Sequence, residues 1–458
     1  MDPITETVRV QKEYFFTGAT KELDFRLRQL RHLKQAIREN EDKIGAALKK
    51  DLNKSRFEAY ETEIGIVLQE ISNAEKHLAQ WIRPQRVRTP FSNMPGRSYI
   101  YAEPYGLVLI MSPWNYPFQL TLAPLVGALA AGNCAVVKPS NEAPATAAVM
   151  AKLLGECFEP RYVAVVAGGR EANQNLLAQK FDYIFFTGGM AAGKAVLEAA
   201  ARHLTPVSLE LGGKSPCIVD ETANLAKAAL RIAWGKCVNA GQTCVAPDYL
   251  LAHRRIKDEL VERIRRQITA FWGHDPQTHP DYPKMVNQKH FERICGLIQS
   301  GGRIVQGGKA NAATRQISLA VLEDVSWDMP IMREEIFGPA LPVLVFDDLR
   351  EVVEKIRERP KPLALYLFTA SKENERYVLN NVSFGGGCVN ETLMHLATPY
   401  LPFGGVGESG MGGYHGKYSF DAFSHQKSIL KKSNLFEPRV RYAPYQDKNL
   451  KILRKFLK

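Results

Sequence analysis

Residues 106–117 read GLVLIMSPWNYP, an apolar run that ends in a loop of proline and aromatic residues. Short apolar runs recur along the chain, most of them followed by a segment with helical spacing, at residues 135–137, 163–166, 183–186, 216–219 and 341–346. Strands that alternate with helices predict a parallel, doubly wound α/β sheet. Such sheets bind ligands at the carboxyl ends of their strands, so we expect chemistry at residues 112–117.

The chain is long enough for more than one hydrophobic core. Its 458 residues predict two to four structural units. The alternation forms two blocks, one beginning at Gly106 and one running from Ser208 to about Val389, which we interpret as two α/β units. Tyr99 to Glu103 alternate as a hairpin or arm would. Two amphipathic helical patterns precede it, formed by Leu30, Leu33, Ile37 and Ile44 and by Ile64, Leu68, Ile71 and Leu78.

Composition places the chain among ordinary globular proteins. Apolar residues make up 45% and charged residues 24%, and no apolar run reaches the length that spans a bilayer. Residues 1–14 mix charges of both signs, which does not fit a conventional secretory signal, so we expect a cytoplasmic protein. None of the seven cysteines pairs at C-x-x-C spacing, so we expect free thiols and no metal site.

The net charge of +12 is concentrated at the C-terminus. Residues 426–458 hold ten Lys or Arg and two acids, which leaves the body close to neutral and gives no reason to expect a nucleic-acid partner. In the tail, Ile452, Leu453, Phe456 and Leu457 share one helical face among basic residues, a pattern that can make weak peripheral contact with an anionic membrane. A solvated or dimer-packed tail is the alternative.

Two glycine patterns resemble nucleotide signatures. Gly188, Gly193 and Lys194 fit the core of a phosphate loop, but Ala195 stands where magnesium binding needs a hydroxyl, which argues against an ATPase. The turn still suits a dinucleotide pyrophosphate, because its backbone amides open a helix after a strand. Residues 405–410 match G-x-G-x-x-G, but no strand precedes them and no helix follows, so we reject that match.

Four segments carry residue types that complement one another chemically. Cys244 ends the polar, glycine-containing turn NAGQTC (239–244), and Asn115 offers an amide for an oxyanion. Glu210 is a lone carboxylate in an apolar strand, where burial would raise its pKa towards use as a general base; the alternative is an edge-strand salt bridge. Lys138 and Ser140 offer a cation and a hydroxyl for a ribose.

Together with EEIFGP (334–339), these segments resemble the aldehyde dehydrogenase superfamily over nearly the whole chain. Residues 206–216, 244–249 and 401–416 resemble its class 3 branch. The resemblance implies an aldehyde dehydrogenase-like α/β fold that forms a homodimer. Its parts would be a Rossmann-type dinucleotide-binding domain (1–81 and 107–209), an α/β catalytic domain (210–395), a small β oligomerisation arm (82–106 and 396–430) and a basic tail (431–458).

The resemblance also implies roles for individual residues. Cys244 would be the nucleophile that forms a thiohemiacetal and then a thioester, Asn115 and the Cys244 backbone amide would form the oxyanion hole, and Glu210 would activate water. The residues implied to bind NAD or NADP are Lys138, Glu335, Phe337 and the turn Gly188, Gly189 and Gly193. Glu335 has also been a candidate base in class 3 enzymes, so the division of labour between Glu210 and Glu335 stays open.

Departures from the family pattern bear on cofactor and substrate. Asn141 replaces an acidic residue that would repel a 2′-phosphate, so we expect both NAD and NADP to be used. Gly189 and Ala192 differ from the usual Ser and Val in the phosphate turn. Trp114, Tyr116 and Trp234 could line an apolar pocket for medium-chain or aromatic aldehydes, or could be core residues. Two alternatives remain. Glu210, as a residue that would activate water, argues against a CoA-acylating activity, and the complete set of catalytic residues argues against a non-catalytic role.

Overall fold

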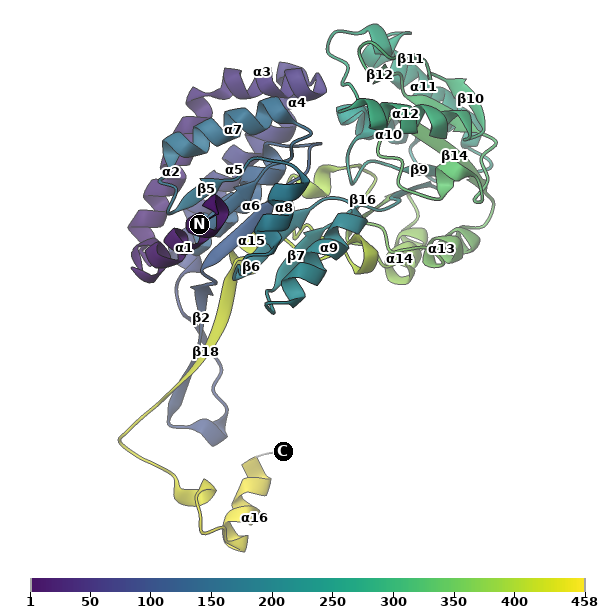
Figure 1. The fold of residues 1–458 in the computed structure, drawn as a ribbon. Helices are drawn as coiled ribbons and strands as arrows, with labels where there is room; N and C mark the ends of the chain where they lie inside the picture. Colours follow the sequence, from purple (N-terminus) through teal and green to yellow (C-terminus); the bar gives the residue numbers. More distant parts are fainter. Residues whose placement is uncertain (1, 457–458) are drawn as a thin grey trace.

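The computed structural model describes residues 2–456, and Figure 1 shows two α/β lobes with a thin arm extending from them. Within these residues the first lobe holds a six-stranded sheet in the order β17-β7-β6-β3-β4-β5. Its strands are parallel except β17. The bounds are β3 Leu107–Met111, β4 Cys134–Lys138, β5 Val163–Val165, β6 Tyr183–Thr187, β7 Val207–Glu210 and β17 Gly410–Met411. The expected doubly wound sheet is confirmed.

Helices cover both faces of this sheet (Figure 1). They are α1 Pro3–Phe16, α2 Leu23–Glu39, α3 Glu41–Leu52, α4 Arg56–Ala59, α5 Gly65–Trp81, α6 Gln119–Ala131, α7 Pro144–Cys157, α8 Arg170–Leu177, α9 Met190–Ala201 and α15 Lys417–Ala422. All thirteen residues of α6 are buried, as its uniformly apolar sequence requires. The first amphipathic pattern is divided between α2 and α3, because α2 ends at Glu39 and Asn40 separates the two helices.

The second lobe holds a seven-stranded sheet in the order β10-β13-β14-β9-β8-β15-β16 among the residues described. Its strands are β8 Pro216–Val219, β9 Tyr249–His253, β10 Arg303–Gln306, β13 Ala320–Glu323, β14 Ala340–Phe346, β15 Ala364–Phe368 and β16 Gly386–Val389. The accompanying helices are α10 Leu225–Cys237, α11 Lys257–Trp272, α12 Gln288–Gln299, α13 Leu349–Arg357 and α14 Lys372–Asn381. A short pair, β11 Ala310–Asn311 and β12 Gln316–Ile317, lies outside this sheet.

The arm is a three-stranded antiparallel sheet in the order β1-β2-β18. Its strands are β1 Gln85–Val87, β2 Gly96–Pro104 and β18 Ser424–Lys432. The alternation at residues 99–103 therefore belongs to an arm strand, and β18 extends two residues past residue 430. Beyond it, α16 Asp447–Phe456 stands away from both lobes (Figure 1). Leu457 and Lys458 lie outside the described residues.

The strand register places the loops that follow several strands of the first lobe side by side at one edge of the sheet. Met111 pairs with Lys138, and Thr187 pairs with Glu210. The ends of β3, β4, β6 and β7 therefore lie along one edge of the sheet, which is where parallel sheets bind ligands. In residues 2–456, no helix combines the length and the apolar content needed to cross a bilayer.

Candidate active site

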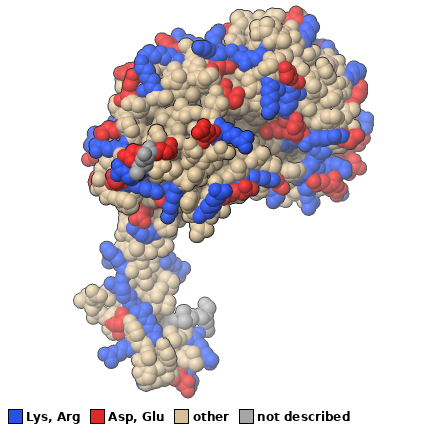
Figure 2. Space-filling view, in the orientation of Figure 1, with Lys and Arg blue, Asp and Glu red and all other residues tan. Residues whose placement is uncertain are grey.

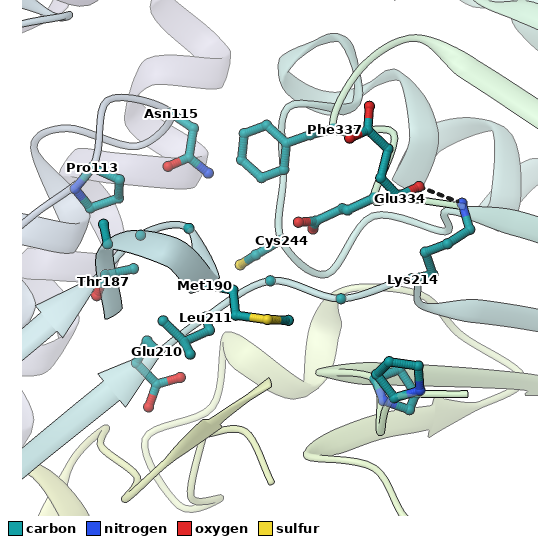
Figure 3. A pocket seen from close by; sticks show the side chains of 18 of the residues that line it. Pro113, Asn115, Thr187, Met190, Glu210, Leu211, Lys214, Cys244, Glu334 and Phe337 are labelled. Atoms are coloured by element: carbon teal, nitrogen blue, oxygen red, sulfur yellow. Dashed lines mark hydrogen bonds between the residues drawn. The ribbon is translucent and has the colours of Figure 1, made fainter. Parts of the chain in front are cut away.

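A cavity of about 680 Å³ lies between the two lobes. Loops at the strand ends of the first lobe line one side of it, and residues of the second lobe line the other. This volume lies in the range of small-molecule sites. Its lining includes residues 112–115 after β3, residues 186–190 at the end of β6, residues 210–214 at the end of β7, and, from the second lobe, Cys244, Glu334, Glu335 and Phe337. Figure 3 shows the side chains of Asn115, Phe337 and Cys244 converging.

Cys244 follows a tight turn whose backbone is left-handed. The φ angles are 50° at Asn239, 50° at Ala240 and 71° at Gly241. Residues other than glycine rarely adopt such angles, and a strained turn persists only where its surroundings hold it. A Cβ atom on Gly241 would lie 2.5 Å from the carbonyl oxygen of Gly338, so only glycine fits there. The turn leaves the Cys244 thiol half-buried and facing the cavity.

The surroundings of Cys244 favour the neutral thiol. Burial raises its pKa first, and the nearby carboxylates of Glu335 and Glu210 raise it further. Backbone N–H groups of Cys244 and Val245 oppose this effect only in part. A thiol attacks carbon as its thiolate, so Cys244 would have to lose its proton before it could act as a nucleophile.

Asn115 is held against the turn that carries Cys244. Its side-chain amide donates to the main-chain carbonyl of Gln242 at 3.1 Å, and the residue is 3% exposed. The next residue is tied to the same turn, because the hydroxyls of Tyr116 and Thr243 are hydrogen-bonded at 2.5 Å. The amide that could bind an oxyanion and the thiol therefore belong to one connected unit.

Glu210 ends β7 and is 2% exposed. Strand β17 pairs with β7, so Glu210 is not on an edge strand, and neither of its carboxylate oxygens has a hydrogen-bond partner among residues 2–456. The salt-bridge alternative is therefore wrong. Burial holds the pKa of Glu210 well above its usual value. In Figure 3 its carboxylate points away from Cys244.

Glu335 and Phe337 come from a loop that buried charges hold in place. Lys214 donates to the carbonyl of Glu334 at 2.9 Å (Figure 3) and pairs with Asp248 at 2.5 Å. Burial and the carboxylate of Asp248 raise the pKa of Glu335 to about 8, against the opposing N–H of Gly213. Phe337 has a φ of 51°, and its ring meets that of Trp114 edge to face at 5.4 Å.

The turn before α9, predicted to bind a pyrophosphate, leaves open space beside its backbone. Gly189 caps the helix, and a Cβ atom built on it would have no neighbour within 4 Å in the described structure, so a ligand could approach the backbone closely. Gly193 lies one turn later, where a Cβ atom would meet the side chain of Leu211 at 2.6 Å. Glycine at 189 thus leaves room for a ligand, whereas glycine at 193 allows the helix to pack closely. Both observations fit a dinucleotide.

The expected ribose contacts lie at the end of β4. Lys138 is 3% exposed, its ammonium donates to the carbonyl of Pro139 at 2.7 Å, and burial lowers its pKa. The hydroxyl of Ser140 accepts from the N–H of Glu142 at 3.2 Å. Neither Lys138 nor Ser140 is among the residues that line the cavity. They lie at the same sheet edge as the cavity, because Lys138 pairs with Met111.

The three aromatic residues predicted for a substrate pocket are placed differently. Tyr116, in the same loop as Asn115, is 8% exposed, and Trp234 packs half-buried against the core. The described cavity lining contains neither of them, but it contains Trp114. Sequence reasoning did not identify several other lining residues, which are Leu120, Thr187, Met190, Leu211 and His290. Their side chains are ordinary core or surface types, and only the meeting of distant loops brings them together.

Comparison with known proteins agrees with this geometry. The model of the aldehyde dehydrogenase family matches residues 4–429. Among curated proteins, a 4,4'-diaponeurosporen-aldehyde dehydrogenase of Staphylococcus aureus is 49% identical over 100% of both chains, and human aldehyde dehydrogenase family 3 member B1 is 45% identical over 99% of this chain and 97% of its own. A solved structure described as a substrate-bound state of Staphylococcus aureus AldH is 48% identical, covers 100% of both chains and has a TM-score of 0.98.

These matches confirm the expected family, its class 3 resemblance, its fold and the use of NAD or NADP. The chain belongs to the aldehyde dehydrogenase family and oxidises aldehydes to carboxylic acids with NAD or NADP.

Proposed function

We propose that the oxidation proceeds through a covalent thioester on Cys244, with Asn115 stabilising the oxyanion and Glu210 activating water. The observation that carries this proposal is the hydrogen bond from the Asn115 amide to Gln242, two residues before Cys244. It keeps an amide donor beside the thiol in a shared cavity. Preorganised donors of this kind stabilise the charge that develops during acyl transfer.

The first steps take place on Cys244. Its thiol loses a proton through water, and the sulfur adds to the aldehyde carbon, which gives a thiohemiacetal oxyanion. The second N–H of the Asn115 amide and the backbone N–H of Cys244 donate to that oxyanion. NAD or NADP, when bound, accepts the hydride that leaves the carbon atom. A thioester on Cys244 then remains.

Glu210 hydrolyses the thioester in this proposal. Its buried carboxyl group is without a hydrogen-bond partner in the described chain, so no hydrogen bond has to break when it turns toward a water molecule near the sulfur. Because burial raises the pKa of Glu210, its carboxylate is a stronger base than an exposed one, which suits a group that takes a proton from water. The acid then leaves Cys244, and the thiol is restored.

The substrate class we propose is apolar aldehydes, both medium-chain aliphatic and aromatic. The side chains of Trp114, Leu120, Met190 and Leu211 support this, because they make the cavity wall largely apolar. We retain the prediction that Tyr116 and Trp234 contribute to binding of the aldehyde substrate. The Staphylococcus aureus relative is named for 4,4'-diaponeurosporen-aldehyde, so we include that aldehyde among the substrates of this chain.

We propose a cytoplasmic homodimer. The seven free cysteines support a reducing compartment. The projecting arm supports dimerisation, since β18 lies at the edge of its sheet and edge strands present unpaired backbone groups to a second chain.

The tail is proposed to make weak contact with an anionic membrane. Leu450 and Ile452 of α16 are 45% and 40% exposed, and Leu435 is 98% exposed. Figure 2 shows Lys and Arg side chains over this projecting part of the molecule. Apolar groups among cations bind anionic lipid surfaces.

A panel of aliphatic and aromatic aldehydes, assayed with NAD and with NADP, tests the catalytic proposal. We expect reduction of either cofactor and formation of the acid, an acyl adduct on Cys244 detectable by mass spectrometry, and loss of turnover in Cys244→Ala with cofactor binding retained. Turnover in Cys244→Ala at the rate of the unsubstituted enzyme would exclude the thioester.

A further inference from the structure

Lys54 is a fully buried cation beneath the loop that carries Asn115. It lies between α3 and α4, is 0% exposed, and forms an ion pair at 2.5 Å with Glu63, which is also 0% exposed. Taking two charges out of water costs several kcal/mol per ion unless further hydrogen bonds satisfy them. The partners of this pair therefore indicate which part of the fold it serves.

Burial raises the pKa of Glu58, the charge of Lys54 lowers it, and Lys54 also contacts the Asn115 loop. Its ammonium donates to the main-chain carbonyl of Asn115 at 3.1 Å and lies 3.8 Å from the centre of the Tyr116 ring. The side-chain amide of Asn239 donates to the same carbonyl at 2.8 Å. Two donors on one carbonyl fix the plane of that peptide bond, and this plane sets the direction in which the Asn115 side chain leaves the backbone.

Glu63 holds the other end of the same loop. Its second carboxylate oxygen accepts the backbone N–H groups of Phe118 at 2.8 Å and Gln119 at 3.1 Å, where α6 begins. The ion pair thus anchors residues 115–119 at both ends. An ordinary structural ion pair would tie the helices together, but here both side chains contact the short segment next to the thiol.

We propose that Lys54, held by Glu63, is a positioning residue that aims the Asn115 amide at the oxyanion formed on Cys244. The inference rests on the proposed role of Asn115. Lys54 touches neither substrate nor cofactor in this proposal and acts only through the Asn115 peptide. Its removal should therefore slow turnover by misdirecting an amide and should leave the chemistry of the thiol itself unchanged.

A double-mutant cycle tests this proposal. The kcat for one aldehyde is measured for the unsubstituted enzyme, Lys54→Met, Asn115→Ala and the double variant, together with the rate of Cys244 alkylation by iodoacetamide. We expect Asn115→Ala to lower kcat by roughly 10²–10³-fold and Lys54→Met by at least about tenfold. In the Asn115→Ala background, Lys54→Met should cause no further loss, and alkylation rates should agree within about twofold.

Independent effects that multiply in the double variant would overturn the inference. So would an equal loss of kcat in Arg26→Met, a control that removes another buried cation, one bonded to Ala130 in α6. If Asn115→Ala itself turns over normally, the proposed function fails instead. Because Lys54→Met leaves Glu63 buried without its partner, the cycle is also run with Lys54→Met/Glu63→Gln, which removes both charges and should give the same result if the protein folds.

Discussion

The carboxylate of Glu335 rests against the backbone of Gly212, so closely that a Cβ atom on Gly212 would lie 2.0 Å from a Glu335 oxygen. Gly212 lies only two residues after Glu210 in the chain. The Glu335 carboxylate therefore contacts the segment that also carries Glu210. Both carboxylates raise the pKa of Cys244. This relationship allows the separate roles of Glu210 and Glu335 to be tested.

Glu335→Gln should speed the alkylation of Cys244 above pH 8 and leave it unchanged at lower pH. The pKa of Glu335 is about 8, so its negative charge opposes thiolate formation only above that pH. We expect an acceleration of up to about tenfold, the change that one pKa unit produces. The measurement is the iodoacetamide rate of cofactor-free enzyme from pH 6 to 10, with Glu334→Gln as the neighbouring control. A slower Gln variant above pH 8 would make Glu335 the base that takes the thiol proton.

Glu210→Gln should separate hydride transfer from thioester hydrolysis. An amide cannot accept the proton of the attacking water, so the acyl group should stay on Cys244. We expect a burst of about one reduced cofactor per active site, followed by a steady rate about 10²–10⁴-fold below that of the unsubstituted enzyme. Stopped-flow absorbance measures both phases, and Cys244→Ala provides the control without a burst. A normal steady rate would remove Glu210 from the mechanism.

Asn141→Glu should weaken NADP use selectively. Asn141 is exposed just beyond β4, beside Gly169, and a carboxylate there would repel a 2′-phosphate. We expect the KM for NADP to rise about tenfold, equivalent to about 1.4 kcal/mol, while the KM for NAD stays within about twofold. Gln299→Glu adds the same charge on α12 and serves as the control. An equal rise for both cofactors would contradict recognition at this position.

Glu58→Gln should remove a pH-dependent part of the stability. Burial raises the pKa of Glu58 from 4.5 to about 7, while its carboxylate accepts the N–H of Asn239 at 2.7 Å. The folded protein therefore holds this proton more tightly than the unfolded chain. The associated stability is complete below pH 4.5 and is lost as pH rises through 7, by up to about 3 kcal/mol.

Urea unfolding of the unsubstituted enzyme and of Glu58→Gln between pH 4.5 and 8 measures this difference. The variant should lose less stability across that interval, whereas Glu198→Gln, an exposed control on α9, should follow the unsubstituted enzyme. Parallel stability curves for the enzyme and Glu58→Gln would show that Glu58 does not titrate in this range.

Truncation after Asn434 should abolish binding to anionic vesicles. The lost segment carries the exposed Leu435, Leu450 and Ile452 together with most of the basic tail. We expect the full chain to co-sediment with anionic vesicles more than with neutral ones, and less as salt rises. Equal behaviour of the two proteins would disprove the membrane contact. Light scattering of the same samples measures whether the arm alone, which the truncation retains, supports the dimer.

The sequence alone was sufficient to predict the parallel strands and the loops that line the cavity. Residues 107–111 form a strand as predicted. Five consecutive apolar residues that end at a proline-rich loop are too few for a helix and typical of a short strand buried on both faces. Cys244 and Asn115 could be selected because their polar segments, taken together with Glu210 and residues 334–339, resemble the aldehyde dehydrogenase superfamily. These features are local, so the order of residues determines them directly.

Only the tertiary structure decided how charged groups are paired. Nothing near Lys54 in the sequence indicates that it contacts Asn115, 61 residues further along the chain. Glu210 has no hydrogen-bond partner for its carboxylate within residues 2–456, and its strand is covered at the edge by β17, a two-residue strand from the distant glycine-rich loop. Periodicity and composition report which residues are buried, whereas electrostatic environments depend on which distant segments meet. The pKa of Cys244 and the orientation of the Asn115 side-chain amide therefore depend on the tertiary structure.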